Sequence, residues 1–85
     1  MSFQAQLQYI VSWILQVPVE NIVMSTDFKK DLKLDMYDFE MMIFQIENCF
    51  KKQLHDHEIG QIQTLQDLSI VLQDAETRAL AIPSA

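Results

Sequence analysis

The sequence predicts an all-α fold of four helices, three longer ones and one short one, with a long loop after the first helix. The chain has 85 residues, which gives room for one domain. It contains one Gly and two Pro, so few of the turn residues that a sheet protein needs are available. Apolar residues also recur at steps of three and four, the spacing of helices that bury one face.

The first helix is expected from Phe3 to about Gln16 or Val17. Its glutamines lie opposite an apolar stripe, which consists of Phe3, Leu7, Ile10, Val11 and Ile14. Pro18 biases Val17 away from the helical region, so the helix should end there. The long polar connection that follows runs to Asp35. Its apolar residues should anchor it to the core and its lysines should face solvent; these are Ile22, Val23, Phe28 and Leu32, and Lys29, Lys30 and Lys33.

The second helix should begin at Asp35, whose carboxylate can accept hydrogen bonds from free backbone N–H groups. Asp38, three residues later, completes an arrangement close to a capping box, and both charges suit the positive end of the helix dipole. One face of this helix should be core, with Met36 at its edge. That face consists of Phe39, Met42, Ile43, Ile46, Cys49 and Phe50.

Two further helical elements are expected in the C-terminal part. Ile59 and Ile62 favour a short turn docked on the bundle, and Thr64 with Asp67 predicts the cap of a last helix from Leu65 to about Glu76. Its apolar stripe is Leu65, Leu68, Val71, Leu72 and Ala75. The chain therefore divides into a helical domain, residues 1–76, and a frayed tail, residues 77–85.

The composition restricts the partners and the cell compartment that fit this chain. The net charge of −6 disfavours a nucleic-acid partner, which needs Lys and Arg to neutralise phosphates, and favours basic protein partners. A single cysteine, Cys49, excludes an internal disulfide and agrees with a reducing compartment. The N-terminus has neither basic leading residues nor a long apolar segment, so a cytoplasmic protein without membrane insertion is expected.

Catalytic and metal chemistry are not expected. The chain is short for a deep cleft and shows neither a nucleophile-base-acid arrangement nor a Gly-rich phosphate loop, so it is not predicted to be an enzyme. His55-Asp56-His57-Glu58 contains metal-ligand types without a third well-placed partner, and no metal site is predicted there. Residues 31–38 lack the central Gly and terminal Glu of a calcium loop.

The order of the predicted elements resembles that of an acyl carrier protein. Four segments are similar to the family in order and spacing, from about Leu7 to Leu72: Val17 to Ile22, Thr26 to Leu32, Phe39 to Phe50, and Thr64 to Leu68. The resemblance implies a four-helix acyl-carrier-protein-like bundle that acts as a carrier and not as a catalyst.

The family signature, Asp-Ser-Leu-Asp, appears here as Asp35-Met36-Tyr37-Asp38. In proteins that resemble this chain, the serine hydroxyl takes a phosphopantetheine arm at the N-terminal end of the second helix. The thioether of Met36 has no proton to lose, so no phosphopantetheine is expected on it. Other hydroxyls near enough to be considered are those of Ser12, Ser25 and Tyr37. Ser12 and Ser25 lack the context of the signature, and the rigid phenol of Tyr37 would hold a phosphate several ångströms from the position that an aliphatic hydroxyl gives it. Met36 is expected to pack against Phe28 and Leu32 as an edge-of-core methionine, and direct contact with a ligand is the alternative.

A partner surface is predicted on the second helix, which carriers that resemble this chain present to their enzymes. Tyr37, Met41 and Phe44 fall within about 60° of one another, away from the core stripe. Aligned exposed apolar side chains mark partner sites. The acidic residues around them can steer a basic partner; these are Asp35, Asp38, Glu40 and Glu47. The alternatives are that a different bundle geometry buries the three apolar side chains, and that the acidic residues form an ordinary solvated face.

The sequence therefore predicts a non-catalytic protein-interaction module that lacks the phosphopantetheine-accepting serine and works beside fatty-acid or polyketide-type enzymes. The alternative is a genuine acyl carrier protein whose carrier function is blocked or altered at Met36.

Overall fold

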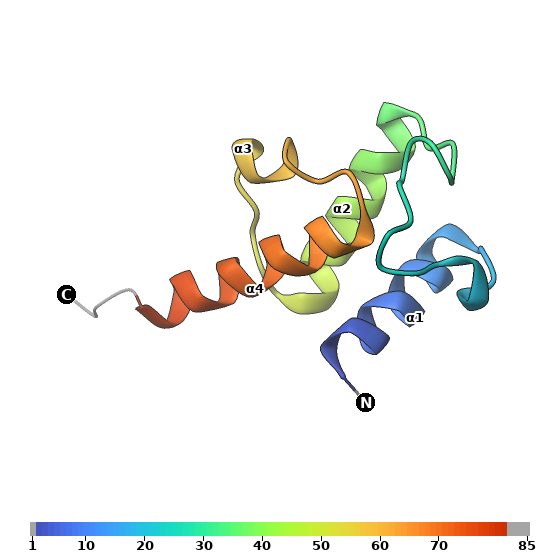
Figure 1. Ribbon diagram of the computed structural model, residues 1–85. Helices are drawn as coiled ribbons and strands as arrows, with labels where there is room; N and C mark the ends of the chain where they lie inside the picture. Colours follow the sequence, from blue (N-terminus) through green and yellow to red (C-terminus); the bar gives the residue numbers. More distant parts are fainter. Residues whose placement is uncertain (1, 82–85) are drawn as a thin grey trace.

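Four helices and one short 3-10 turn form the computed structural model, which describes the backbone of residues 2–81 and the side chains of residues 2–75. They are α1 (Phe3–Leu15), η1 (Val19–Asn21), α2 (Met36–Phe50), α3 (Asp56–Ile59) and α4 (Leu65–Ala81). Within the described residues there is no strand, only an isolated bridge between Asp27 and Thr64. Figure 1 shows α4 crossing α2, with α1 beside them and the C-terminal half of α4 extending from the body. The predicted all-α class is confirmed.

α1 begins at the predicted Phe3 and ends close to the position that Pro18 predicts. The Ser2 hydroxyl accepts a hydrogen bond from the backbone N–H of Ala5 at 3.1 Å. At the other end, Gln16 takes a left-handed conformation with φ 56°, and its N–H donates to the carbonyl of Ser12. The predicted end of this helix, just before Pro18, is confirmed.

The loop between α1 and α2 is anchored by Ile22 and Phe28, which are both buried. The Ile22 carbonyl accepts a 2.8 Å hydrogen bond from Gln8 Nε2, which joins the loop to α1. Val23 is exposed, so its predicted role as an anchor is wrong. Its backbone N–H donates to Thr26 Oγ1 at 2.9 Å, and this tight turn leaves the Val23 side chain outside. The other predictions for the loop are confirmed, with Leu32 partly buried and Lys29, Lys30 and Lys33 exposed.

α2 packs most of its predicted apolar stripe into the core. Met42, Ile43 and Ile46 are buried, and Phe39 and Phe50 are partly buried. The Phe50 ring packs against Phe3 of α1, with 5.5 Å between the ring centroids. Cys49 is exposed, so its predicted place in the core is wrong. It lies at one edge of the stripe in the last turn, where a rotation of one residue is enough to leave the core.

The chain returns to the bundle through α3 and α4. Ile59 is partly buried and Ile62 is buried, which confirms the docking of the short turn. At the start of α4, Thr64 Oγ1 accepts from the N–H of Asp67 (3.2 Å) and Asp67 Oδ2 accepts from the N–H of Thr64 (3.1 Å). This reciprocal capping box was predicted. The predicted stripe of α4 is buried: Leu65, Leu68, Val71, Leu72 and Ala75.

α4 continues to Ala81, so its predicted end at Glu76 is wrong. Residues 77–81 are rich in Ala, Leu and Arg, which favour helix, and the helix-stopping Pro83 comes two residues after its end. The division into a domain of residues 1–76 and a frayed tail of residues 77–85 stays a prediction, and residues 82–85 lie outside the described part of the chain.

Three backbone hydrogen bonds join the first loop to the start of α4, and one of them runs from the N–H of Gln66 to the carbonyl of Met24 at 2.9 Å. The N–H of Phe28 donates to the carbonyl of Gln63 at 2.9 Å, and the N–H of Leu65 donates to the carbonyl of Thr26 at 3.1 Å. They hold the loop that leads into α2 against a capped helix. Among the described residues, no helix has both the length and the apolar character to cross a bilayer.

Candidate functional site

The candidate site lies at the start of α2, where Met36 is the first helical residue. Asp35 precedes it as N-cap, and Asp35 Oδ1 accepts from the backbone N–H of Asp38 at 2.7 Å, so the predicted cap is confirmed. Met36 and Tyr37 follow the cap in the first turn and are 69% and 70% exposed. The prediction that Met36 packs into the edge of the core is therefore wrong, because the first turn of α2 leaves its side chain largely exposed where it helps to line a pocket.

The loop that enters this turn is held by Asp27. One carboxylate oxygen, Oδ1, accepts from the backbone N–H groups of Lys30 (2.8 Å) and Lys29 (2.9 Å), and the N–H of Asp27 donates to Asp31 Oδ2 (2.8 Å). The hydrogen bond from the Lys30 N–H is the largest cause of a lowered pKa at Asp27. The N–H of Lys29 and the positive charges of both lysines add to it and outweigh desolvation, which acts in the opposite direction.

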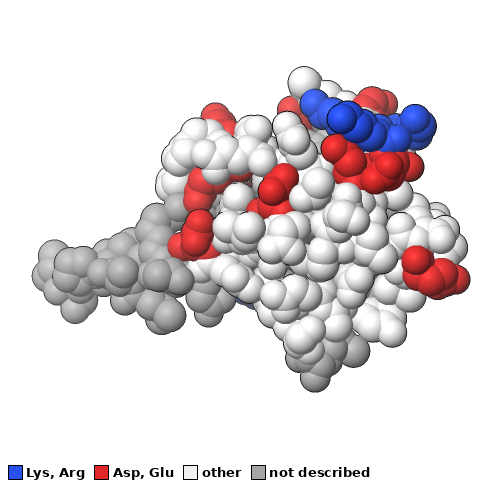
Figure 2. Space-filling view, viewed as in Figure 1, with Lys and Arg blue, Asp and Glu red and all other residues white. Residues whose placement is uncertain are grey.

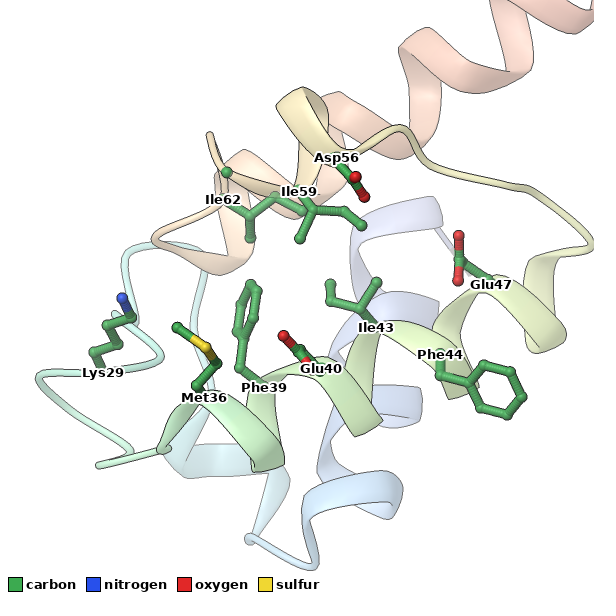
Figure 3. A pocket seen from close by; sticks show the side chains of 11 residues that line it. Lys29, Met36, Phe39, Glu40, Ile43, Phe44, Glu47, Asp56, Ile59 and Ile62 are labelled. Carbon is green, nitrogen blue, oxygen red and sulfur yellow. The ribbon is translucent and has the colours of Figure 1, made fainter.

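A pocket of about 460 Å³ opens between α2 and α3. Its walls are mainly apolar: Met36, Phe39, Ile43, Phe44, Ile59 and Ile62. Figure 3 shows Phe39 and Ile43 rising from α2 toward Ile59 and Ile62 on the opposite side, with Met36 near one end. A pocket of this size with apolar walls can take an extended apolar group.

Polar groups stand at both ends of the pocket, and Glu40 lies between Phe39 and Ile43 along its α2 side (Figure 3). Lys29 lies at the end near Met36, and Glu47 and Asp56 lie at the other end (Figure 3). Glu47 Oε2 accepts a 2.8 Å hydrogen bond from the backbone N–H of Leu54 and fixes the segment that leads into α3. Glu47 is partly buried by this contact, so it differs from the freely exposed acidic residue that the sequence predicts.

The outer side of α2 carries the three apolar residues predicted to face a partner. Tyr37, Met41 and Phe44 are 70%, 40% and 57% exposed, so the alternative that the bundle buries them is wrong. Phe44 also lines one edge of the pocket, from which its ring points outward in Figure 3. Three of the four acidic residues predicted around them are also exposed: Asp35, Asp38 and Glu40. Figure 2 shows acidic side chains over much of this view, with the basic ones gathered in one group.

The segment around α3 uses its polar residues to build local structure. Glu58 is buried, and its Oε1 accepts from the backbone N–H of His55 at 2.8 Å. The rings of His55 and His57 stack with 5.8 Å between their centroids. Among the described residues, no group of three His, Cys, Asp or Glu side chains comes close enough together to hold a metal ion.

Comparison with known proteins gives the family. No protein-family model matches the chain. An acyl carrier protein of Cylindrotheca sp. (strain N1) is 39% identical over 62 residues, which cover 73% of this chain and 78% of that protein. The chain belongs to the acyl carrier protein family. An acyl carrier protein of Trieres chinensis is 34% identical over 64 residues (75% of this chain, 80% of that protein). Acyl carrier protein 3 of Ralstonia nicotianae is 29% identical over 70 residues, 82% of this chain and 80% of that protein.

Membership of this family accounts for the lack of catalytic machinery in the sequence. Acyl carrier proteins are non-catalytic carriers that work with biosynthetic enzymes, and the prediction that the chain is not an enzyme is confirmed on that ground. The helical architecture of the chain is consistent with the family bundle.

The sequence did not reveal the pocket. Its walls come from segments far apart in the chain, since Lys29 precedes α2 and Ile59 follows it by nine residues. The apolar character of Ile59 and Ile62 was visible, but it predicted only that they would dock on the bundle. A gap left between two docked helices has no local signal in the sequence.

Proposed function

We propose that this chain is a non-catalytic interaction module of the acyl carrier protein family that carries no phosphopantetheine, because Met36 occupies the position of the family's attachment serine. The observation that carries the proposal is the setting of Met36. It is an exposed side chain on the first residue of α2, directly after an N-cap whose carboxylate bonds to the N–H of Asp38. A hydroxyl at that position would be open to a modifying enzyme, whereas a thioether offers it no group to modify.

The other hydroxyls have settings that support the proposal. Attachment needs an oxygen that can form a phosphodiester. The Ser12 hydroxyl donates to the carbonyl of Val17 at 2.6 Å and is partly buried. Ser25 is exposed but lies in the loop before the Asp27 hydrogen bonds, ten residues ahead of the N-cap Asp35. The Tyr37 phenol would hold a phosphate several ångströms farther from the helix than an aliphatic hydroxyl does.

The partner that fits is a biosynthetic enzyme with a basic docking surface around an apolar recess. Tyr37, Met41 and Phe44 supply exposed apolar area in the middle, and acidic side chains lie beside them. Opposite charges speed encounter and fix orientation, while the apolar contacts supply most of the binding free energy. We assign this role to the cytoplasm, beside enzymes of fatty-acid or polyketide type.

Intact mass spectrometry tests the proposal. The chain is incubated with a phosphopantetheinyl transferase and coenzyme A, next to an ordinary acyl carrier protein as positive control. We expect the control to gain the mass of the phosphopantetheine group and this chain to keep its own mass. An adduct on any residue would overturn the proposal, and peptide mapping would then identify the residue that replaces the serine.

A second candidate function is a genuine acyl carrier protein whose carrier function is blocked or altered at Met36. The observation in its favour is the largely apolar pocket between α2 and α3, which Met36 helps to line and which has the volume to take an apolar group. Tyr37 counts against it, because a carrier blocked at one position would keep the leucine expected beside the serine. The variants at positions 36 and 37 described in the Discussion separate the two functions.

A further inference from the structure

Glu47 lies where the proposed partner surface of α2 meets the pocket. It comes three residues after Phe44, at the edge of the side of α2 that carries the exposed apolar residues, and it also lines the pocket. Figure 3 shows the Glu47 side chain rising from α2 on the side where α3 lies, with Phe44 directed outward beside it. Its oxygen Oε2 accepts the 2.8 Å hydrogen bond from the backbone N–H of Leu54. One carboxylate therefore borders the partner surface and holds the segment that leads to the opposite wall of the pocket.

The segment that Glu47 holds is short. α3 has four residues, Asp56–Ile59, which are too few for a helix that is stable by itself. Leu54 is buried just before it, and Ile59 within it is only partly buried. Glu58 Oε1 accepts from the N–H of His55, which closes the first turn of α3 without joining it to α2. The hydrogen bond from Leu54 to Glu47 does join this segment to α2, so the position of α3 depends on it.

The carboxylate of Glu47 is also a group that a basic partner can bind at this end of α2. Arginine pairs most strongly with a carboxylate through two parallel hydrogen bonds, one to each oxygen. In the free chain, the N–H of Leu54 occupies Oε2. An arginine that takes both oxygens therefore displaces Leu54, whose N–H loses its acceptor.

We propose that Glu47 couples partner docking to the opening of the pocket. An arginine of the partner takes the Glu47 carboxylate, Leu54 is released, and α3 moves away from α2, so that the pocket widens. This inference rests on the proposed function for its basic partner. The coupling is reciprocal, because a chain whose α3 has already moved presents a Glu47 carboxylate that is free to bind.

Residue-resolved hydrogen exchange measures the release of α3. Glu47→Ala should speed exchange of the Leu54 amide roughly tenfold or more, the factor expected when a hydrogen bond to a charged group is lost. Exchange of the Leu68 amide in α4 should stay unchanged, which separates local opening from unfolding of the domain. Glu47→Gln keeps an acceptor oxygen and should change exchange much less. Glu40→Ala is the matched control, since it removes an exposed carboxylate from the same pocket.

An arginine placed on α2 itself can stand in for the partner. Phe44→Arg puts a guanidinium one turn before Glu47, within reach of its carboxylate. It should speed exchange of the Leu54 amide more than Phe44→Lys does, because lysine adds the same charge but cannot bind both oxygens in parallel. Combined with Glu47→Gln, which removes the charge that attracts the guanidinium, Phe44→Arg should have no further effect on this amide.

A dye measures the width of the pocket. Fluorescence of 1-anilinonaphthalene-8-sulfonate, which binds exposed apolar surface, should rise in Glu47→Ala above the level in Glu40→Ala. The two variants lose the same charge, so a difference between them reports the released α3.

Four results would overturn the proposal. The Leu54 amide could exchange at the wild-type rate in Glu47→Ala, or the Leu68 amide could speed up as much as Leu54, which would mean that the whole domain opens. Phe44→Arg could act no more strongly than Phe44→Lys, or the dye could respond equally to Glu47→Ala and Glu40→Ala. Each of these leaves the proposed function intact, because attachment of phosphopantetheine does not involve Glu47. An adduct in the mass assay would overturn the proposed function without changing exchange at Leu54.

Discussion

The carboxylate of Asp35 accepts a 2.7 Å hydrogen bond from the backbone N–H of Asp38, and Met36 and Tyr37 lie between the two residues. The same hydrogen bond therefore ends the long loop, starts α2 and fixes the direction in which the two exposed side chains leave the helix. The stability of the first turn of α2 and the geometry of the candidate site therefore both depend on the hydrogen bond between Asp35 and Asp38. Variants at Asp35 test this dependence.

Replacing Asp35 by Ala should lower the free energy of unfolding by about 1 kcal/mol, because the first turn of α2 loses its acceptor and a favourable charge. For a domain of this size that corresponds to a fall of roughly 4–8 °C in Tm. Asp35→Asn is the matched control, since it keeps the acceptor oxygen and removes the charge. Thermal unfolding measures the Tm of both variants. If Asp35→Ala and Asp35→Asn lower Tm equally, the effect is due to the charge alone.

Phe28→Ala should be the more damaging of two phenylalanine truncations, at about 3–5 kcal/mol. Phe28 is buried in the core, and its ring packs edge-on against that of Phe39 with 5.9 Å between the ring centroids. Phe50 is only partly buried at the end of α2. Urea unfolding of Phe28→Ala and Phe50→Ala measures the difference. If both variants lose the same stability, the loop anchor contributes no more than the end of α2.

Acidification should destabilise the chain in part through Asp27. Its pKa lies below the ordinary value of 3.8 in the folded protein, so the folded state binds this proton less readily than the unfolded state does. The stabilisation is present above the unfolded pKa and is lost as pH falls through the lower, folded pKa. Asp27→Asn should make the urea midpoint less dependent on pH in this acidic range. Asp74→Asn, at an exposed position on α4, is the control, and an equal flattening there would contradict the assignment.

Replacing Met41 and Phe44 together by Ser should leave Tm nearly unchanged, because exposed side chains contribute little to the core. Capture of biosynthetic enzymes from the native host's lysate should fall, since apolar anchors often carry on the order of 2 kcal/mol or more each in an interface. Capture by the wild-type chain should also weaken as salt rises. Phe28→Ala serves as the control for core damage. If the double variant is folded and still captures the same enzymes, the docking surface does not lie on this side of α2.

Met36→Ser restores a hydroxyl directly after the Asp35 cap while Tyr37 remains beside it. We expect phosphopantetheinyl transferase to modify this variant slowly, and to modify Met36→Ser with Tyr37→Leu faster, because the double variant also has the leucine expected of the family. Intact mass over time gives both rates against an ordinary carrier. If Met36→Ser alone is modified as fast as the ordinary carrier, the result favours the second candidate function, a carrier blocked at Met36 alone.

The sequence by itself determined the helices, the caps of α2 and α4 and most of the core. Asp35 and Thr64 could be identified as caps because a capping bond joins residues three apart, and Leu65 to Ala75 could be assigned to the core because a helical stripe is periodic. It also determined the family, since the resemblance rests on segments in a fixed order. The end of α4 was missed because the helix-forming Ala, Leu and Arg residues beyond Glu76 extend the helix without an apolar periodic signal.

Only the tertiary structure decided which side chains at the edges of these patterns face solvent. Cys49, Val23 and Met36 are each apolar, but their exposure depends on how one turn is rotated against its neighbours. The structure likewise decided that Glu47 holds the segment before α3 and that Lys29 and Ile59 share a pocket. Contacts between segments far apart in the chain depend on how the packed helices are arranged, and no single segment of the sequence contains that information.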